Sequence, residues 1–290
     1  MLQSSATTTK VNGWLSQLAG RQPLLVFFLL AYAFGWAGFL PLVLSNIGWG
    51  LIRADVPIEF VVVGVSSPTI AALCTQWLLD RNFRFCRLYS SWQRMLLGAV
   101  VGLALIMLAC VILPGILLVK SSPRDLQWSA LWTPAVYRVN WSTFLGGPLN
   151  EEPGWRGFAL PRLQARFGPV VGSLLLGILW AGWHLPLFFI HFVNVPVWAF
   201  TIILVTVSLF ITLGTNLSGF AVVVPIIIHA GFNTSPRLLA ALCEAIPTRQ
   251  PELPFYLAAG AAAAGAAVLL TRGRLGSGAT PTAQGRKGLR

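Results

Sequence analysis

Long apolar runs recur along this sequence of 290 residues, and they limit the possible folds more than any other feature. A helix needs roughly 20 mostly apolar residues to cross a bilayer. Seven runs come close to or exceed that length, and an eighth is less hydrophobic. We therefore expect an all-α, polytopic integral membrane bundle of about eight transmembrane helices. The clear runs lie near 23–44, 58–79, 95–119, 170–190, 196–216, 219–242 and 254–271, and the weaker one lies at about 141–160.

Charged residues are scarce, since only 10% of the chain is Asp, Glu, Lys or Arg, against about 25% in a soluble domain. The net charge of +12 could indicate binding to nucleic acid. However, the basic residues lie in short loops and in the C-terminal tail, without a basic domain or an aromatic-basic motif. We interpret them as topology signals and as contacts with anionic lipid, and we expect no nucleic-acid partner. The four cysteines lack paired or metal-ligand spacing and are interpreted as packing residues.

The distribution of the basic loops predicts the orientation of the chain. Loops on the cytoplasmic side of a membrane protein are enriched in Lys and Arg. Placing both termini in the cytoplasm puts most basic residues on that side, including those of the loop at 81–94. This asymmetry favours an even number of spans, in what we expect to be the plasma (inner) membrane. We predict one transmembrane domain at 1–271 and a disordered, basic cytoplasmic tail at 272–290.

The weak span at 141–160 carries two adjacent carboxylates, Glu151 and Glu152. An ionisable group near the middle of a membrane costs about 2.5 to 3.5 kcal/mol on insertion scales, so it indicates a functional site by default. On a helix, Glu152 and Arg156 share one face and can form an ion pair. Glu151 is rotated from Glu152 by about 100°, and we expect it to lack a charge partner and to act as a general base. The alternative is that both acids only anchor the helix at its loop end.

Two histidines, His184 and His229, lie inside two other apolar runs. Trp180 precedes the first by four residues and Asn233 follows the second by four, so each pair shares a helix face. A lone histidine on an apolar face is usually a packing residue. Here, however, three helices each carry a polar group at interior depth, and hiding all of them from lipid requires them to converge. We therefore predict a polar site where the three helices meet.

Three short motifs follow one another within this core at 141–243. They are Glu-Glu-x-x-x-Arg at Glu151, Glu152 and Arg156, within NEEPGWRGFALPRL; aromatic-x-x-x-His at Trp180 and His184; and His-x-x-x-Asn at His229 and Asn233. In this order and in apolar helices, they resemble the CPBP family, which includes type II CAAX prenyl endopeptidases and bacteriocin-processing or immunity relatives. The resemblance implies an eight-helix intramembrane endopeptidase with a water-filled cavity. Its substrate would be a membrane-associated or lipidated protein or peptide.

The motif residues suit the hydrolysis of a peptide bond. Glu151 and His184 could hold and deprotonate a water molecule, while His229 and Asn233 could donate hydrogen bonds to the oxyanion. Trp180 and the remaining charged residues of the first motif, Glu152 and Arg156, would then hold the catalytic groups in place.

A metal-dependent variant of this chemistry remains open. Glu151, His184 and His229 could ligate Zn²⁺ with one open position. The sequence lacks the His-Glu-x-x-His helix of common zinc peptidases, and we therefore favour a mechanism without a cofactor.

Two functions of other classes compete with the peptidase. A catalytically inactive immunity or scaffold protein could keep the site as a structural polar core, and a proton-coupled transporter could use buried Glu and His as a relay. The complete set of motif residues argues against the first. The second lacks the paired broken helices that transporters often show in two halves.

Overall fold

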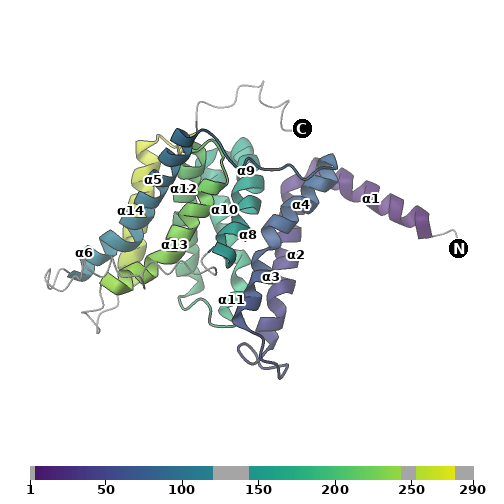
Figure 1. The fold of residues 1–290 in the computed structure, drawn as a ribbon, viewed down its shortest axis with the longest axis horizontal. Helices are drawn as coiled ribbons and strands as arrows, with labels where there is room; N and C mark the ends of the chain where they lie inside the picture. Colours follow the sequence, from purple (N-terminus) through teal and green to yellow (C-terminus); the bar gives the residue numbers. More distant parts are fainter. Residues whose placement is uncertain (1–3, 120–143, 243–252, 278–290) are drawn as a thin grey trace.

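The structure, a computed structural model, describes residues 4–119, 144–242 and 253–277 (Figure 1). These residues form an all-α fold, with one isolated bridge between Arg87 and Ala221. The α-helices are α1 Ser4–Arg21, α2 Pro23–Leu44, α3 Val61–Val65, α4 Ser67–Asp80, α5 Trp92–Met107, α6 Leu113–Val119, α8 Pro148–Glu152, α9 Leu160–Phe167, α10 Pro169–Trp183, α11 Leu185–Phe188, α12 Val197–Leu217, α13 Val223–Leu242 and α14 Leu253–Leu270. A 3₁₀ turn, η1 (Ile58–Phe60), precedes α3, and two π-helical segments, η2 (Leu108–Ile112) and η5 (Pro153–Ala159), continue α5 and α8.

Within the described residues, four helical stretches are long and apolar enough to cross a membrane. They are Pro23–Leu44, Ile58–Asp80, Trp92–Ile116 and Val197–Leu217, and two shorter apolar helices lie at Pro169–Trp183 and Leu257–Leu270. The all-α fold predicted from the apolar runs is confirmed, and the chain has the helices of an integral membrane protein. The total of eight spans remains a prediction.

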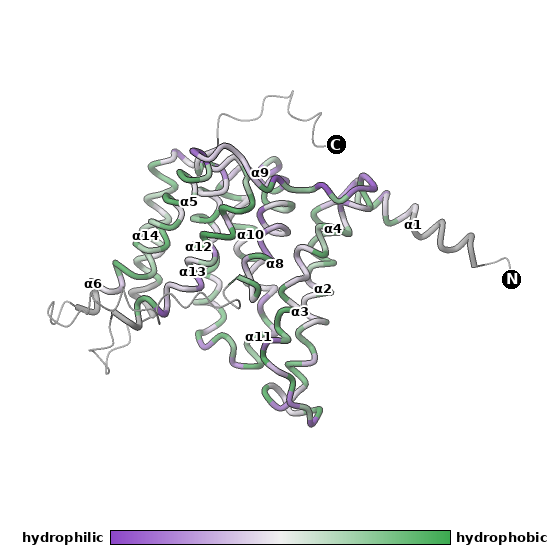
Figure 2. Tube along the Cα trace, in the orientation of Figure 1, coloured by the Kyte–Doolittle hydropathy of each residue, from purple (hydrophilic) through white to green (hydrophobic). Residues whose placement is uncertain are grey.

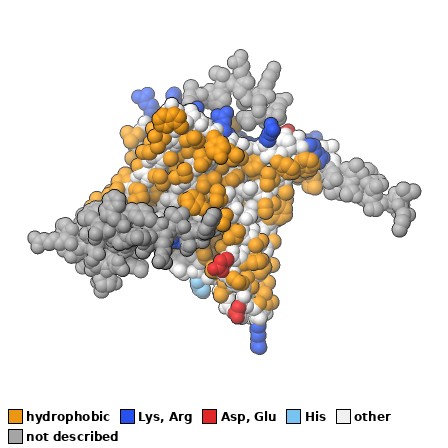
Figure 3. Space-filling view, in the orientation of Figure 1, with side chains coloured by type: hydrophobic (Ala, Val, Ile, Leu, Met, Phe, Trp, Pro, Cys, Tyr) orange, Lys and Arg blue, Asp and Glu red, His pale blue; other side chains and the backbone are white. Residues whose placement is uncertain are grey.

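The surface has the polarity that a bilayer would require. Figure 2 shows hydrophobic stretches along the helices, and Figure 3 shows hydrophobic side chains over much of the described surface below a rim of Lys and Arg. On α5, the side chains of Leu96, Leu97 and Val100 are each more than half exposed. Large exposed apolar surfaces of this kind are rare on soluble monomers and mark contact with membrane or partner.

The start of α2 and residues 272–277 lie at the same upper end of the bundle (Figure 1). Leu275 is fully buried there, and its carbonyl accepts a hydrogen bond of 2.9 Å from Asn216 Nδ2 at the end of α12. The packed part of the chain therefore extends beyond the boundary at 271 that we expected, while residues 278–290 lie outside the described residues. The start of α2 and the packed end of the described chain thus lie on the same side of the bundle.

The predicted weak span is a broken helix, and it lies further along the chain than expected. It starts at Pro148, after a turn at Gly147, and continues through η5 into α9, which ends at Phe167. Residues 141–143 lie outside the described residues. Pro153 opens η5, because proline has no N–H to donate into the α-helical pattern and the backbone widens there.

Aromatic side chains fix η5 against α2 and α10. The ring of Trp155 lies edge-on to Phe27 (5.5 Å between centroids) and to Trp183 (5.9 Å), and all three side chains are fully buried. Trp183 Nε1 also donates to the carbonyl of Ala31 at 3.2 Å and to Ser67 Oγ at 3.1 Å. The helix with the two carboxylates is thus held rigidly inside the bundle.

A glycine allows η5 to touch α4. A Cβ atom at Gly154 would overlap the backbone of Pro68, so we expect Gly154→Ala to lower the free energy of unfolding by about 1 to 3 kcal/mol, as overpacking does. The control is Gly265→Ala on α14, where a Cβ atom would meet nothing within 4 Å. Thermal unfolding of both variants in detergent measures the difference. Equal midpoints would show that the contact between η5 and α4 is not close.

Candidate active site

An ion pair lies at the centre of the bundle. Arg156 Nη1 donates to Glu152 Oε1 at 2.9 Å, and both side chains are fully buried. The pair predicted from the four-residue spacing is therefore present. The guanidinium of Arg156 also lies over the ring of Trp180, with 4.5 Å from Cζ to the ring centroid, so that α8, η5 and α10 meet at this cation.

The same carboxylate oxygen binds a histidine from α13. His229 Nδ1 lies 2.7 Å from Glu152 Oε1, and the imidazole is almost fully buried. Glu152 Oε1 already accepts a hydrogen bond from Arg156. A carboxylate oxygen can accept a second one, so we assign Nδ1–H of His229 as the donor in this contact. The sequence did not predict this contact between residues that lie 77 positions apart.

Glu151 is held by two indoles instead of a cation. Its Oε2 accepts from Trp180 Nε1 at 2.6 Å and from Trp155 Nε1 at 3.3 Å, and the residue is 2% exposed. In the described part of the chain, no Lys, Arg or His forms an ion pair with it, as expected from its rotation away from Glu152. Both donors bind Oε2, which leaves Oε1 as the oxygen available for other contacts.

Groups from α8 and α13 converge on the turn before α8. A Cβ atom at Gly147 would lie 3.0 Å from Glu151 Oε1, 3.5 Å from Asn233 Nδ2 and 3.6 Å from His229 Cε1. α8 packs against α13 on one side and α4 on the other, which explains how these side chains come together. Two of the three predicted polar helices therefore meet at one point, and the third, α10, reaches it through Trp180.

His184 lies at the C-terminal cap of α10, because Pro186 ends the helix there. Its Nδ1 is 2.8 Å from the carbonyl oxygen of Trp180. A carbonyl only accepts, so Nδ1 carries the proton and Nε2 of the neutral ring is an acceptor. The ring packs against Trp183 and Phe200 at centroid distances of 4.8 and 5.3 Å. No hydrogen bond joins His184 to Glu151 in the described residues, so their joint action on water remains a prediction.

The predicted zinc ligands do not form a metal cluster in this arrangement. Among the described residues, no group of three or more His, Cys, Asp or Glu side chains could hold a metal ion. Glu151 Oε2 is bound by indoles, and the Nδ1 atoms of His184 and His229 bind Trp180 and Glu152. We therefore derive the chemistry of this site from the side chains alone.

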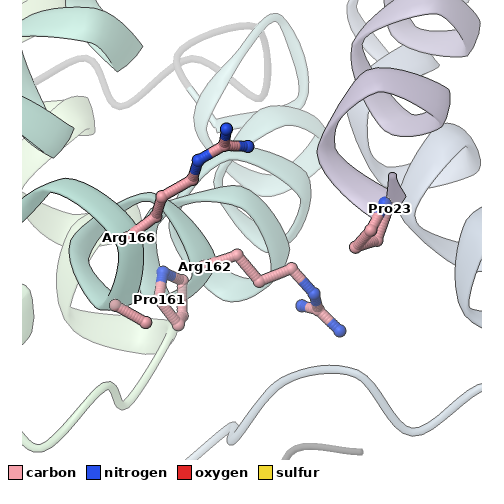
Figure 4. A pocket seen from close by; sticks show the side chains of 5 residues that line it. Pro23, Pro161, Arg162 and Arg166 are labelled. Carbon is pink, nitrogen blue, oxygen red and sulfur yellow. The ribbon is translucent and has the colours of Figure 1, made fainter. Parts of the chain in front are cut away.

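A separate pocket of about 290 Å³ lies at the rim, between α9 and the start of α2 (Figure 4). Arg162 is fixed there, since its guanidinium lies 3.7 Å from the ring centroid of Phe158 and donates to the Phe158 carbonyl at 2.9 Å. The pocket contains none of the site residues. Its lining residues are Pro23, Pro161, Arg162, Ala165 and Arg166.

Comparisons with known proteins point to the same part of the chain. Residues 130–235 match the family described as "Type II CAAX prenyl endopeptidase Rce1-like". The chain is also similar to "CAAX prenyl protease 2" of Methanococcus maripaludis, with 32% identity over 99 residues, which is 31% of this chain and 36% of that protein. The chain thus aligns with little more than a third of the relative's length. The family match includes every motif residue that lines the polar site.

Proposed function

We propose, from the match of residues 130–235 to the Rce1-like type II CAAX prenyl endopeptidase family, that the chain is an intramembrane endopeptidase of this kind. It hydrolyses a peptide bond in a membrane-associated or lipidated polypeptide. The observation that carries this proposal is the convergence of a carboxylate, an amide and an imidazole beside Gly147, inside a helical bundle whose core is largely hydrophobic. Following the charge asymmetry of the loops, we propose that both termini face the cytoplasm.

Glu151 is the proposed general base. Its Oε1 takes a proton from a water molecule as the water oxygen bonds to the carbonyl carbon of the substrate. The carbonyl becomes a tetrahedral oxyanion, which then collapses as the bond between carbon and nitrogen breaks. Glu151 returns the proton to the departing nitrogen, and the products are a carboxylic acid and an amine. The two indoles on Oε2 fix the rotamer of Glu151 so that Oε1 faces the reacting atoms.

The groups on α13 are the proposed stabilisers of the oxyanion. Asn233 is partly buried, and its amide forms no hydrogen bond with the described residues, so Nδ2 is available to donate. His229 binds Glu152 through Nδ1, which orients the ring, and Nε2 is its proposed donor to the oxyanion. Arg156 holds Glu152 in place. For His184 we propose a role as second acceptor for the attacking water, through Nε2.

Asn233→Ala tests the oxyanion donor. We expect kcat to fall by about 100-fold to 1,000-fold with little change in KM, because the donor acts mainly in the transition state. The matched control is Thr234→Ala on the same helix, because the hydroxyl of Thr234 donates to its own helix at Ala230 O (2.8 Å). Steady-state cleavage of a fluorogenic peptide in lipid vesicles measures both variants. If the Asn233→Ala variant cleaves the peptide as fast as the Thr234→Ala variant does, Asn233 is not the oxyanion donor.

The substrate class follows from the family and is tested directly. The probe is a farnesylated peptide that ends in a Cys-aliphatic-aliphatic-X sequence, presented in vesicles to the purified protein, and the same peptide without the lipid is the comparison. We expect mass spectrometry to show cleavage of the lipidated peptide by the wild type and not by Glu151→Gln. Cleavage of neither peptide would contradict the proposed function, and equal cleavage by both proteins would contradict the assigned base.

A further inference from the structure

Gly147 is a residue of this site that its motifs do not include. It is buried and lies directly before α8, where its carbonyl accepts from the backbone N–H of Asn150 at 3.0 Å and of Glu151 at 2.8 Å. It therefore starts the helix that carries the proposed base. These bonds use only the backbone of Gly147 and would be made by any residue, so they do not explain why the position has no side chain.

The surroundings of Gly147 differ from those of the glycines that pack helices together. A Cβ atom at Gly154 would meet the backbone of Pro68, and one at Gly177 would lie 2.7 Å from Cα of Val205. Those glycines allow two helices to approach. Around Gly147, the nearest atoms belong instead to the carboxylate of Glu151, the amide of Asn233 and the imidazole of His229. The atoms nearest to Gly147 therefore belong to the groups proposed to react.

Hydrogen bonds hold both the turn at Gly147 and the carboxylate of Glu151 in place. On one side, Asn150 Nδ2 donates to the carbonyl of Leu145, and Thr69 Oγ1 on α4 donates to the carbonyl of Asn150 at 2.7 Å, which ties the turn to the bundle. On the other side, two indoles hold the carboxylate of Glu151. A methyl group 3.0 Å from Glu151 Oε1 is therefore too close for an ordinary contact, and the carboxylate would have to shift.

From this geometry we infer that Gly147 is a positioning residue of the proposed reaction. Its missing side chain lets Glu151 Oε1 keep its place beside Asn233 Nδ2, because a Cβ atom would lie 3.0 Å from Oε1 and displace it. This inference rests on the proposed endopeptidase function. Glycine suits this place because it has no Cβ atom, and a larger side chain would displace the carboxylate further.

The test is a graded series, Gly147→Ala and Gly147→Val, with Gly265→Ala as the control glycine on the exposed side of α14. With the lipidated peptide as substrate, we expect Gly147→Ala to lower kcat by about 100-fold, as small misplacements of reacting groups do, while KM and the midpoint of thermal unfolding stay near those of the wild type. Gly147→Val should show no detectable cleavage. Gly265→Ala should cleave at the wild-type rate.

Each other outcome is decisive. If Gly147→Ala cleaves as fast as Gly265→Ala, the inference is wrong and the proposed function stands. If Gly147→Ala does not fold, the inference is also wrong, because the glycine then serves the turn and not the reaction. If the wild type itself cleaves nothing, the proposed function fails, and this inference fails with it.

Discussion

Glu151→Gln is expected to lower kcat by roughly 100-fold to 10,000-fold, the usual contribution of a general base, while the protein remains folded. The amide has the size of the carboxylate, and its oxygen can still accept from Trp155 and Trp180, which bind Oε2 in the wild type. What the substitution removes is the ability of Oε1 to take a proton from water. Because Glu151 forms no ion pair within the described chain, no cation is left unpaired by the change.

The control for this prediction is Glu59→Gln, at an exposed glutamate of η1. Single-turnover cleavage of the lipidated peptide measures the chemical step, and size-exclusion chromatography in detergent reports the folded fraction. If Glu151→Gln is folded and its rate is within a few fold of that of Glu59→Gln, then Glu151 is not the base.

Arg156→Met is expected to destabilise the protein by about 3 to 5 kcal/mol, because it leaves a buried carboxylate without its cation. Glu152 is fully buried, and Arg156 Nη1 is one of the two donors that its Oε1 receives. The control is Arg166→Met on α9, which removes an exposed arginine. The double variant Glu152→Gln with Arg156→Met should recover part of the loss, since neither charge then remains buried.

Folded yield and the midpoint of thermal unfolding in detergent measure this second effect. The order expected is Arg166→Met close to the wild type, the double variant intermediate, and Arg156→Met lowest. Equal yields for Arg156→Met and Arg166→Met would contradict a buried ion pair at this place.

Local helix geometry explains why part of this site was accessible from the sequence. Residues four apart on a helix share a face, and this alone predicts the contact between Glu152 and Arg156. The apolar runs predict the all-α fold because crossing a bilayer requires long helices. The same geometry predicts that Glu151, unlike Glu152, does not pair with Arg156. In the structure, Glu151 accepts hydrogen bonds from two indoles instead.

Contacts between distant helices were not accessible, because they depend on how the helices pack. The sequence did not predict the contact between Glu152 and His229, nor the hydrogen bond from the indole of Trp180 to Glu151. The joint action of Glu151 and His184 on water remains a prediction. A motif identifies residues by their spacing, but it contains no information on which carboxylate faces which neighbouring helix.

The turn at Gly147 was missed for a related reason. A glycine carries no side chain that marks it as part of a site, and its place beside the reacting groups appears only once α8 and α13 are packed together. The helix boundaries moved for local reasons, since the proline at 153 widens the weak span and the proline at 186 ends α10 before His184.

The proposed mechanism places the scissile carbonyl between Glu151 Oε1 and Asn233 Nδ2. An experimental structure of Glu151→Gln with the uncleaved lipidated peptide bound tests it most directly. We expect the carbonyl oxygen of the scissile bond within about 3.2 Å of Asn233 Nδ2, a hydrogen-bond distance, with the carbonyl carbon facing the side of Glu151 Oε1. A peptide bound elsewhere, such as in the pocket of Arg162 and Arg166, would contradict this placement.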